Sequence, residues 1–194
     1  ARLASLSTFL LGGVVLFRDS RNRTNQVFAS YSWTIALWSL CFSQLHTIPV
    51  PWAIWYGRLL HLGCIFIPVL FFNFVMILSG AFKKEKVKII VAYTIAVIFN
   101  LLNLFPGFFT EEIVYRNGYA YPRPIGLIYF SYFLFFVIVV SYSLIKLWKI
   151  VSQTDSKKQR IGFYLLILAT LLGYLGGMNN FLIMIDVQMF PLFP

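Results

Sequence analysis

Two ionisable side chains, Arg58 and His61, lie in an otherwise apolar run, WYGRLLHLGCIFIP at residues 55–68. Their spacing of three residues places them on one face of a helix, one turn apart. Ionisable groups in a membrane-spanning helix cost about 2.5–3.5 kcal/mol at its centre on insertion scales, and they usually face the bundle interior or a water-filled cavity. The pair could therefore line a pocket and contact an anionic or polar group of a ligand.

Each of these residues also has a purely structural interpretation. The long stem of Arg58 would let its guanidinium reach the lipid headgroups while the stem stays in the membrane. His61 lies deeper, where a buried histidine would be hydrogen-bonded to a neighbouring helix. Both interpretations stay open from the sequence.

Other polar side chains are expected at the same level of neighbouring helices, where a ligand from outside would arrive. Asparagines in membrane helices can equally be structural hydrogen-bonding groups between helices. The candidate ligand-binding residues of this outer pocket are Gln44, His46, Arg58, His61, Asn103, Tyr129 and Asn180.

No arrangement of residues in the sequence indicates catalysis. There is no Gly-rich phosphate loop and no Ser-His-Asp set, and the two histidines and two cysteines do not have a recognised metal-site spacing. Haem or pigment contact by His46 and His61 is an alternative that two histidines alone do not support. We therefore expect no catalytic residue, no metal and no cofactor.

The composition places these residues in a membrane. Hydrophobic residues make up 60% of the 194 residues and charged residues 11%, whereas a soluble domain carries about 25% charged residues. We therefore expect an all-α integral membrane protein. The net charge of +10 does not indicate a nucleic-acid partner, because the basic residues form short clusters between apolar runs.

The apolar runs predict a bundle of about six to seven transmembrane helices, since a helix needs about 20 apolar residues to cross the bilayer. We expect a single domain over residues 1–194, with an incomplete first helix and a final outer loop that leads to a helix the chain lacks. The predicted spans are 3–17 (partial), 27–45, 54–78, 87–105, 125–150 and 161–178, and the loop is 179–194.

Basic residues cluster after alternate spans: three arginines at 18–23, four lysines at 83–88, and five Lys or Arg at 146–160. Short basic loops stay in the cytoplasm, so we expect the N-terminus outside and Arg58 at the outer end of the third span. The longest connection, 106–124, is predicted to be an outer loop because Gly, Pro and Asn break helices. Long loops of this kind often serve as binding elements or lids.

Four stretches, in the right order, resemble the N-terminal seven-transmembrane sensor region of bacterial histidine kinases. One departure is Ile183, where the family often has Pro. The stretches are RDSRNRTNQVFASYSWTIALWSL at 18–40, WYGRLLHLGCIFIPVLFFNF at 55–74, NGYAYPRPIGLIYFSYF at 117–133 and LGYLGGMNNFLIMIDVQMFPLFP at 172–194.

The resemblance implies a non-enzymatic sensor module that perceives a small or membrane-soluble signal and drives a cytoplasmic output domain. It implies a multi-pass protein of the bacterial inner membrane, in contact with the lipid bilayer, as a homodimer or in a larger membrane complex. The alternative is an accessory structural subunit of such a complex. A transporter is not favoured, because the inner halves of the predicted spans are nearly free of polar residues, with Asn73 as the main exception.

Overall fold

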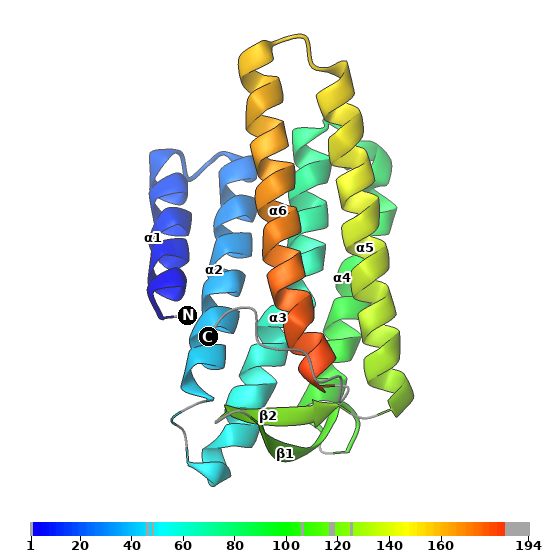
Figure 1. The fold of residues 1–194 in the computed structure, drawn as a ribbon. Helices are drawn as coiled ribbons and strands as arrows, with labels where there is room; N and C mark the ends of the chain where they lie inside the picture. The colour runs from blue at the N-terminus through cyan, green and yellow to red at the C-terminus, as the bar shows by residue number, and fades with distance from the viewer. Residues whose placement is uncertain are drawn as a thin grey trace. The chain divides into compact units, whose positions relative to one another are not determined.

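The structure is a computed structural model, and it describes the backbone of residues 2–45, 47, 49–105, 107–116, 119–124 and 126–184. Within these ranges the chain forms helices joined by short turns, with one β-hairpin between the fourth and fifth helices (Figure 1). The elements are α1 (Arg2–Arg18), α2 (Arg23–Gln44), α3 (Val50–Leu78), α4 (Phe82–Leu104), β1 (Thr110–Arg116), β2 (Tyr119–Pro124), α5 (Gly126–Gln153) and α6 (Lys157–Met184).

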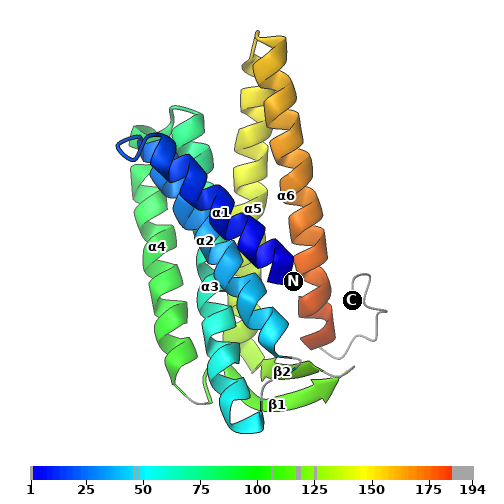
Figure 2. The same ribbon diagram turned by 90° about the vertical axis from the view of Figure 1, so that its left-hand side faces the viewer.

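The chain divides into two compact units, residues 1–143 and 144–194. In the first unit α3 is the central helix: α2 and α4 both pack against it, and α1 packs across α2 (Figures 1 and 2). Buried residues make up 72% of the most apolar stretch of α3, against 28% of that of α4. The core of this unit therefore lies along α3.

The second unit consists of the end of α5, from residue 144, and of α6, joined by a short turn. The rings of Trp148 and Tyr164 meet edge to face within it, with their centroids 6.0 Å apart. The structure continues α6 to Met184, beyond the predicted span end at 178. Residues 185–194 of the predicted outer loop lie outside the described residues.

All the described helices except α5 begin before the apolar runs that predicted them, by one to five residues. The side chain of Asn22 caps α2 by accepting a hydrogen bond of 2.9 Å from the Thr24 backbone N–H, which satisfies one free donor of the first turn. The fourth helix starts at Phe82, through the lysine run, because Lys and Glu are good helix formers. The turn before it uses Gly80 in the left-handed region, with φ of +66°.

A β-hairpin occupies much of the connection that we predicted as an irregular outer loop. Its two strands pair antiparallel, with Val114 opposite Tyr121 and Arg116 opposite Tyr119. The backbone N–H of Ala120 donates a 2.9 Å hydrogen bond to the carbonyl of Leu45, next to the end of α2. The hairpin is thereby attached to the end of the first unit where α2 ends and α3 begins (Figure 1).

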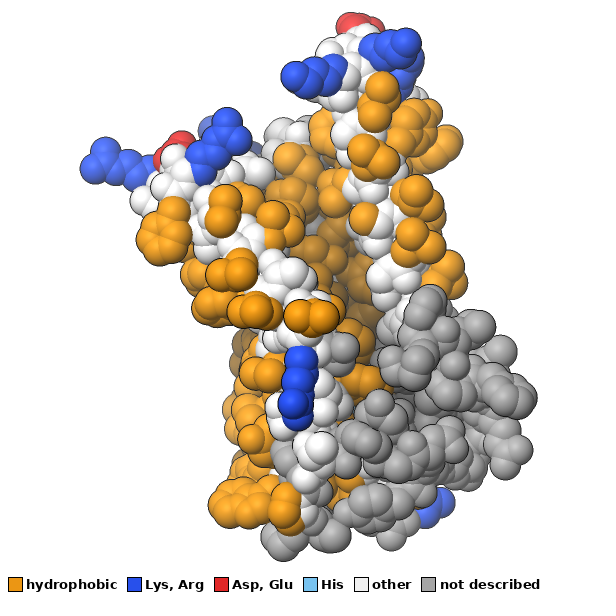
Figure 3. Space-filling model, turned by 60° about the vertical axis from the view of Figure 1, so that its left-hand side comes forward, with side chains coloured by type: hydrophobic (Ala, Val, Ile, Leu, Met, Phe, Trp, Pro, Cys, Tyr) orange, Lys and Arg blue, Asp and Glu red, His pale blue; other side chains and the backbone are white. Residues whose placement is uncertain are grey.

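Four of the described helices, α3 to α6, are long and apolar enough to cross a membrane. The helix α1 has 17 residues, and α2, with 22, is made less apolar by its Ser, Thr and Gln side chains. Lys and Arg side chains gather at the turn after α1 and, in the second unit, at the turn between α5 and α6 (Figure 3). Hydrophobic side chains cover the helices next to these turns, as expected for segments in a lipid bilayer.

Close contact between α2 and α3 depends on Gly63. A Cβ atom at this position would lie 3.1 Å from the Thr34 carbonyl oxygen and 3.3 Å from the Trp38 backbone nitrogen. Neither backbone atom can move without shifting α2. Small residues at a membrane helix interface allow such close approach.

We predict that Gly63→Ala lowers the stability of the protein by about 1–3 kcal/mol, the usual cost of overpacking. The matched control is Gly13→Ala in α1, where an added Cβ meets nothing within 4 Å and should cost nothing, because Ala is the better helix former. Thermal unfolding in detergent, followed by tryptophan fluorescence, measures both. A Tm of the Gly63 variant equal to or above that of the control would contradict this packing.

Candidate functional site

The imidazole of His61 is the centre of the site predicted from the sequence. It is 1% exposed, and its Nδ1 lies 2.8 Å from the carbonyl oxygen of Gly57, one turn earlier in α3. A carbonyl can only accept, so Nδ1 carries the proton, and in a neutral imidazole Nε2 is then an acceptor. This buried Nε2 has no hydrogen-bond partner among the described residues.

Aromatic rings enclose the imidazole. The ring of Phe109, from the segment that leads into β1, meets it edge to face with centroids 5.2 Å apart, and the ring of Tyr129 in α5 does so at 5.7 Å. Phe109 is 0% exposed and also contacts the rings of Tyr129, Tyr132 and Phe99. We call His61, Phe99, Phe109, Tyr129 and Tyr132 the aromatic cluster.

Polar bonds tie three helices together around the cluster. The Asn103 side chain in α4 donates a 2.9 Å hydrogen bond to the Arg58 carbonyl in α3. The Tyr132 hydroxyl in α5 donates to the Cys64 Sγ in α3, at 3.1 Å. The Asn103 Oδ1 is buried without a partner among the described residues, so the side chain that bonds to the Arg58 carbonyl carries a second unpaired acceptor.

The guanidinium of Arg58 does not enter the aromatic cluster. It stacks over the ring of Trp55, one turn earlier in α3, with Cζ 4.8 Å from the ring centroid. The Arg58 side chain is half-buried, while Trp55 is 52% exposed. The Nε of Arg58 is buried and has no hydrogen-bond partner among the described residues.

The structure brings together some of the predicted site residues and leaves others apart. His61 and Tyr129 are in contact, and Asn103 is bonded to the backbone of Arg58. Gln44 is half-buried at the end of α2, and no hydrogen bond joins its side chain to the aromatic cluster within the described residues. His46 lies outside the described residues, as does the side chain of Asn180, whose backbone belongs to α6.

Sequence reasoning missed Phe109 and Cys64 as members of this site. Phe109 belongs to a connection that gave no regular pattern, and Cys64 was interpreted as a small core hydrophobe. The signal that was available is the spacing of Cys64 from His61, which places both one turn apart on α3.

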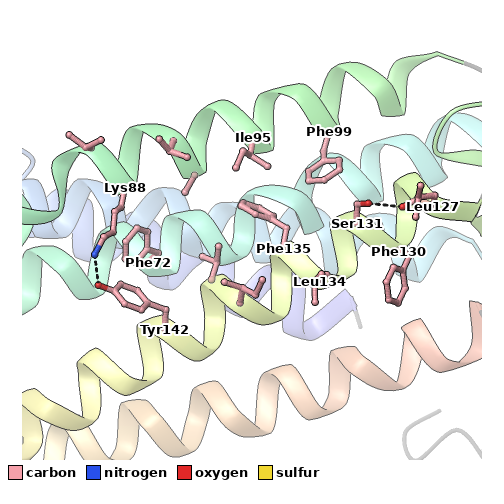
Figure 4. A pocket seen from close by; sticks show the side chains of 15 residues that line it. Phe72, Lys88, Ile95, Phe99, Leu127, Phe130, Ser131, Leu134, Phe135 and Tyr142 are labelled. Carbon is pink, nitrogen blue, oxygen red and sulfur yellow. Dashed lines mark hydrogen bonds between the residues drawn. The ribbon is translucent and has the colours of Figure 1, made fainter.

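A second feature of the first unit is a groove of about 850 Å³ between α4 and α5, which we call the α4–α5 groove. Ile95 and Phe99 of α4 and Leu134 and Phe135 of α5 line its middle (Figure 4). Lys88 and Tyr142 lie at one end and Ser131 toward the other. The hydroxyl of Ser131 donates to the Leu127 carbonyl of its own helix at 2.8 Å, so the groove is apolar except at the Lys88 end.

Three polar groups form a closed triangle at that end. The Lys88 ammonium lies 2.7 Å from Glu85 Oε2 and donates to the Tyr142 hydroxyl at 3.0 Å. Tyr142 in turn donates to Glu85 Oε1 at 3.1 Å. Glu85 is 4% exposed. Asn73, the polar exception noted from the sequence, donates to the Tyr93 hydroxyl at 3.1 Å.

Within the described residues no three His, Cys, Asp or Glu side chains lie close enough together to hold a metal ion. Cys41 and Cys64 are both buried free thiols. The described part of the chain therefore offers aromatic faces and a few unpaired acceptors, which can bind a ligand.

Apolar helices of membrane-spanning length, with a polar site enclosed by aromatic rings, define a helical membrane protein. The sequence model of the family described as the N-terminal 7TM region of histidine kinase matches residues 2–193. The chain belongs to this family, whose members are the N-terminal membrane sensor regions of histidine kinases and not their catalytic domains. No curated protein and no solved structure matches it.

We predict that Phe109→Ala destabilises the protein by about 3–5 kcal/mol, because it leaves a cavity at the centre of the aromatic cluster. The hairpin should also loosen, so the backbone N–H of Ala120 should exchange faster with solvent. Thermal unfolding and hydrogen exchange of residues 119–124 measure the two effects. The neighbouring Phe108 is 47% exposed, and Phe108→Ala is the matched control; equal effects of the two changes would show that Phe109 is not central.

Proposed function

We propose that the chain is a sensor module that perceives a small or membrane-soluble signal at the aromatic cluster and relays it to a cytoplasmic output domain. Membership of the histidine-kinase sensor family supports this role. In this proposal the chain is itself non-enzymatic and is part of a multi-pass protein of six to seven spans in the bacterial inner membrane. Its N-terminus lies outside, and it acts as a homodimer or in a larger complex without a cofactor.

The observation that carries the proposal is the unpaired Nε2 of His61. A buried acceptor without a partner costs about 1–3 kcal/mol, and an apolar ring at this position would avoid that cost. The neutral imidazole accepts from a hydroxyl or an amide N–H. We therefore infer that the signal is a small, largely apolar molecule with one such donor, held between the aromatic rings.

The same geometry supports a mechanism for relaying the signal. His61 is 1% exposed and its ring contacts those of Phe109 and Tyr129, so in this proposal a ligand reaches Nε2 by displacing one of these rings. Phe109 is attached to the hairpin and Tyr129 to α5, a single helix from Gly126 to Gln153. A ligand that binds better when a ring is displaced shifts the equilibrium toward that arrangement, and α5 carries the change toward the basic turn at its other end.

The test uses the full-length protein that contains these residues, in membrane vesicles, with autophosphorylation as the readout. The probes are small alcohols and amides, each paired with an ether or ester of similar size that lacks the O–H or N–H donor. We predict that a donor-bearing probe changes the rate of phosphorylation and its paired compound does not. His61→Phe keeps a ring but removes Nε2, and it should abolish that difference.

Thr94→Ala in α4 is the control variant. Its exposed hydroxyl donates to the Ile90 carbonyl of its own helix at 3.0 Å, and Thr94 is not part of the aromatic cluster. It should respond like the unchanged protein. A response that persists in His61→Phe would exclude His61 as the ligand contact. A full-length protein without a kinase or other output domain would instead favour the accessory subunit.

A further inference from the structure

The α4–α5 groove shares Phe99 with the aromatic cluster, but its lining is otherwise different in chemistry. Its middle is apolar, and its volume of about 850 Å³ is within the roughly 300–1,000 Å³ typical of small-molecule sites. The residues on its two sides are largely exposed: Val87 is 73% exposed, Leu127 79% and Ile138 58%. An apolar groove of this kind in a membrane helix pair is open to the hydrocarbon of the bilayer.

One end of the groove carries positive charge. The Lys88 side chain remains 61% exposed although it bonds to Glu85 and Tyr142. An ammonium group has three donors, and the third has no partner in the part of the chain that the structure describes. Lys83, Lys84 and Lys86 are exposed on the same turns of α4, so the groove ends beside a cationic cluster.

The length of the groove fits one leaflet of a bilayer. It runs along α4 from Val87 to Phe99, which corresponds to about 18 Å at the helical rise of 1.5 Å per residue. The hydrocarbon core is about 30 Å thick, or roughly 15 Å per leaflet. A chain whose headgroup sits at Lys88 would therefore end near the middle of the membrane.

We propose that the α4–α5 groove binds an anionic phospholipid of the leaflet that contains the N-terminal end of α4. One acyl chain lies in the apolar groove, and the phosphate accepts the free N–H of Lys88. The groove is open to the bilayer, so its occupant should be a lipid. The lysines beside its end are positively charged, so an anionic lipid should bind better than a neutral one. Glu85 and Tyr142 position the ammonium group at the mouth of the groove.

The test measures binding of spin-labelled phosphatidylglycerol and phosphatidylcholine to the full-length protein in vesicles, as the fraction of label that the protein restricts. We predict a preference for phosphatidylglycerol that Lys88→Gln lowers about fivefold, the effect of one cationic charge near a membrane surface. Lys86→Gln removes the same charge from an exposed residue outside the groove, and should lower the preference by a clearly smaller factor.

Two further variants keep the test decisive. The double change Glu85→Gln and Lys88→Gln preserves the net charge and leaves no buried carboxylate without its cation. This variant should still lose the preference for phosphatidylglycerol. Ser131→Trp fills the groove from an exposed position on α5, and should reduce the restricted lipid of both kinds. Equal losses in the Lys86 and Lys88 variants, or no effect of Ser131→Trp, would overturn the proposal.

The same position distinguishes a lipid from a protein in the groove. With Ser131→Cys, the new thiol is exposed at the groove, while Cys41 and Cys64 of this chain are buried. If a lipid occupies the groove, an oxidant should form no disulfide between two copies at this position. Efficient disulfide cross-linking between two copies would show that protein covers the groove and would contradict the lipid site.

Discussion

The hydrogen bond from His61 Nδ1 to the Gly57 carbonyl is the constraint on which the rest of the site depends. It fixes the orientation and the tautomer of an imidazole that is 1% exposed, and it leaves Nε2 as a buried acceptor without a partner in the described residues. Such an acceptor costs about 1–3 kcal/mol, so the site is less stable than an apolar core at the same position would be. A ligand with one donor would recover that free energy, which gives binding a source of energy to move the rings around it.

The residues around His61 connect its site to the hairpin and to several helices. Phe109 lies between His61 and the rings of α5, and the hairpin that follows it is fixed to the end of α2 by the bond from Ala120 to Leu45. Tyr132 is bonded to Cys64 and Asn103 to the backbone of Arg58, so α3, α4 and α5 all contact one site. A displacement of Phe109 would therefore shift both the hairpin and the rings of α5. Close packing of α2 on α3 at Gly63 keeps the central helix in place beneath them.

The sequence predicts the helices well, because about 20 apolar residues between basic clusters have few alternatives to a membrane helix. It also places His61 and Tyr129 at one end of neighbouring helices, where the structure shows them in contact. Helix ends are less predictable. The first residues of α4 are a charged run, and hydropathy alone predicts a loop there. The central place of Phe109 depends on a fold of residues 106–124 that no local pattern indicates. The triangle at Glu85 has a local signal, the spacing of three residues to Lys88, but its partner Tyr142 is distant in sequence and its burial is set by packing.

The proposed ligand contact requires a neutral His61 ring whose Nε2 is unprotonated. The most direct measurement is the ¹⁵N spectrum of histidine-labelled full-length protein in lipid, with His46→Gln to leave His61 as the one labelled position of this chain. The account predicts a neutral ring with a protonated Nδ1 and an unprotonated Nε2, and the Nε2 signal should move toward that of a hydrogen-bonded acceptor when a compound that alters kinase activity is added. A proton on Nε2 in the absence of ligand, or an activating compound that leaves the Nε2 signal unchanged, would contradict it.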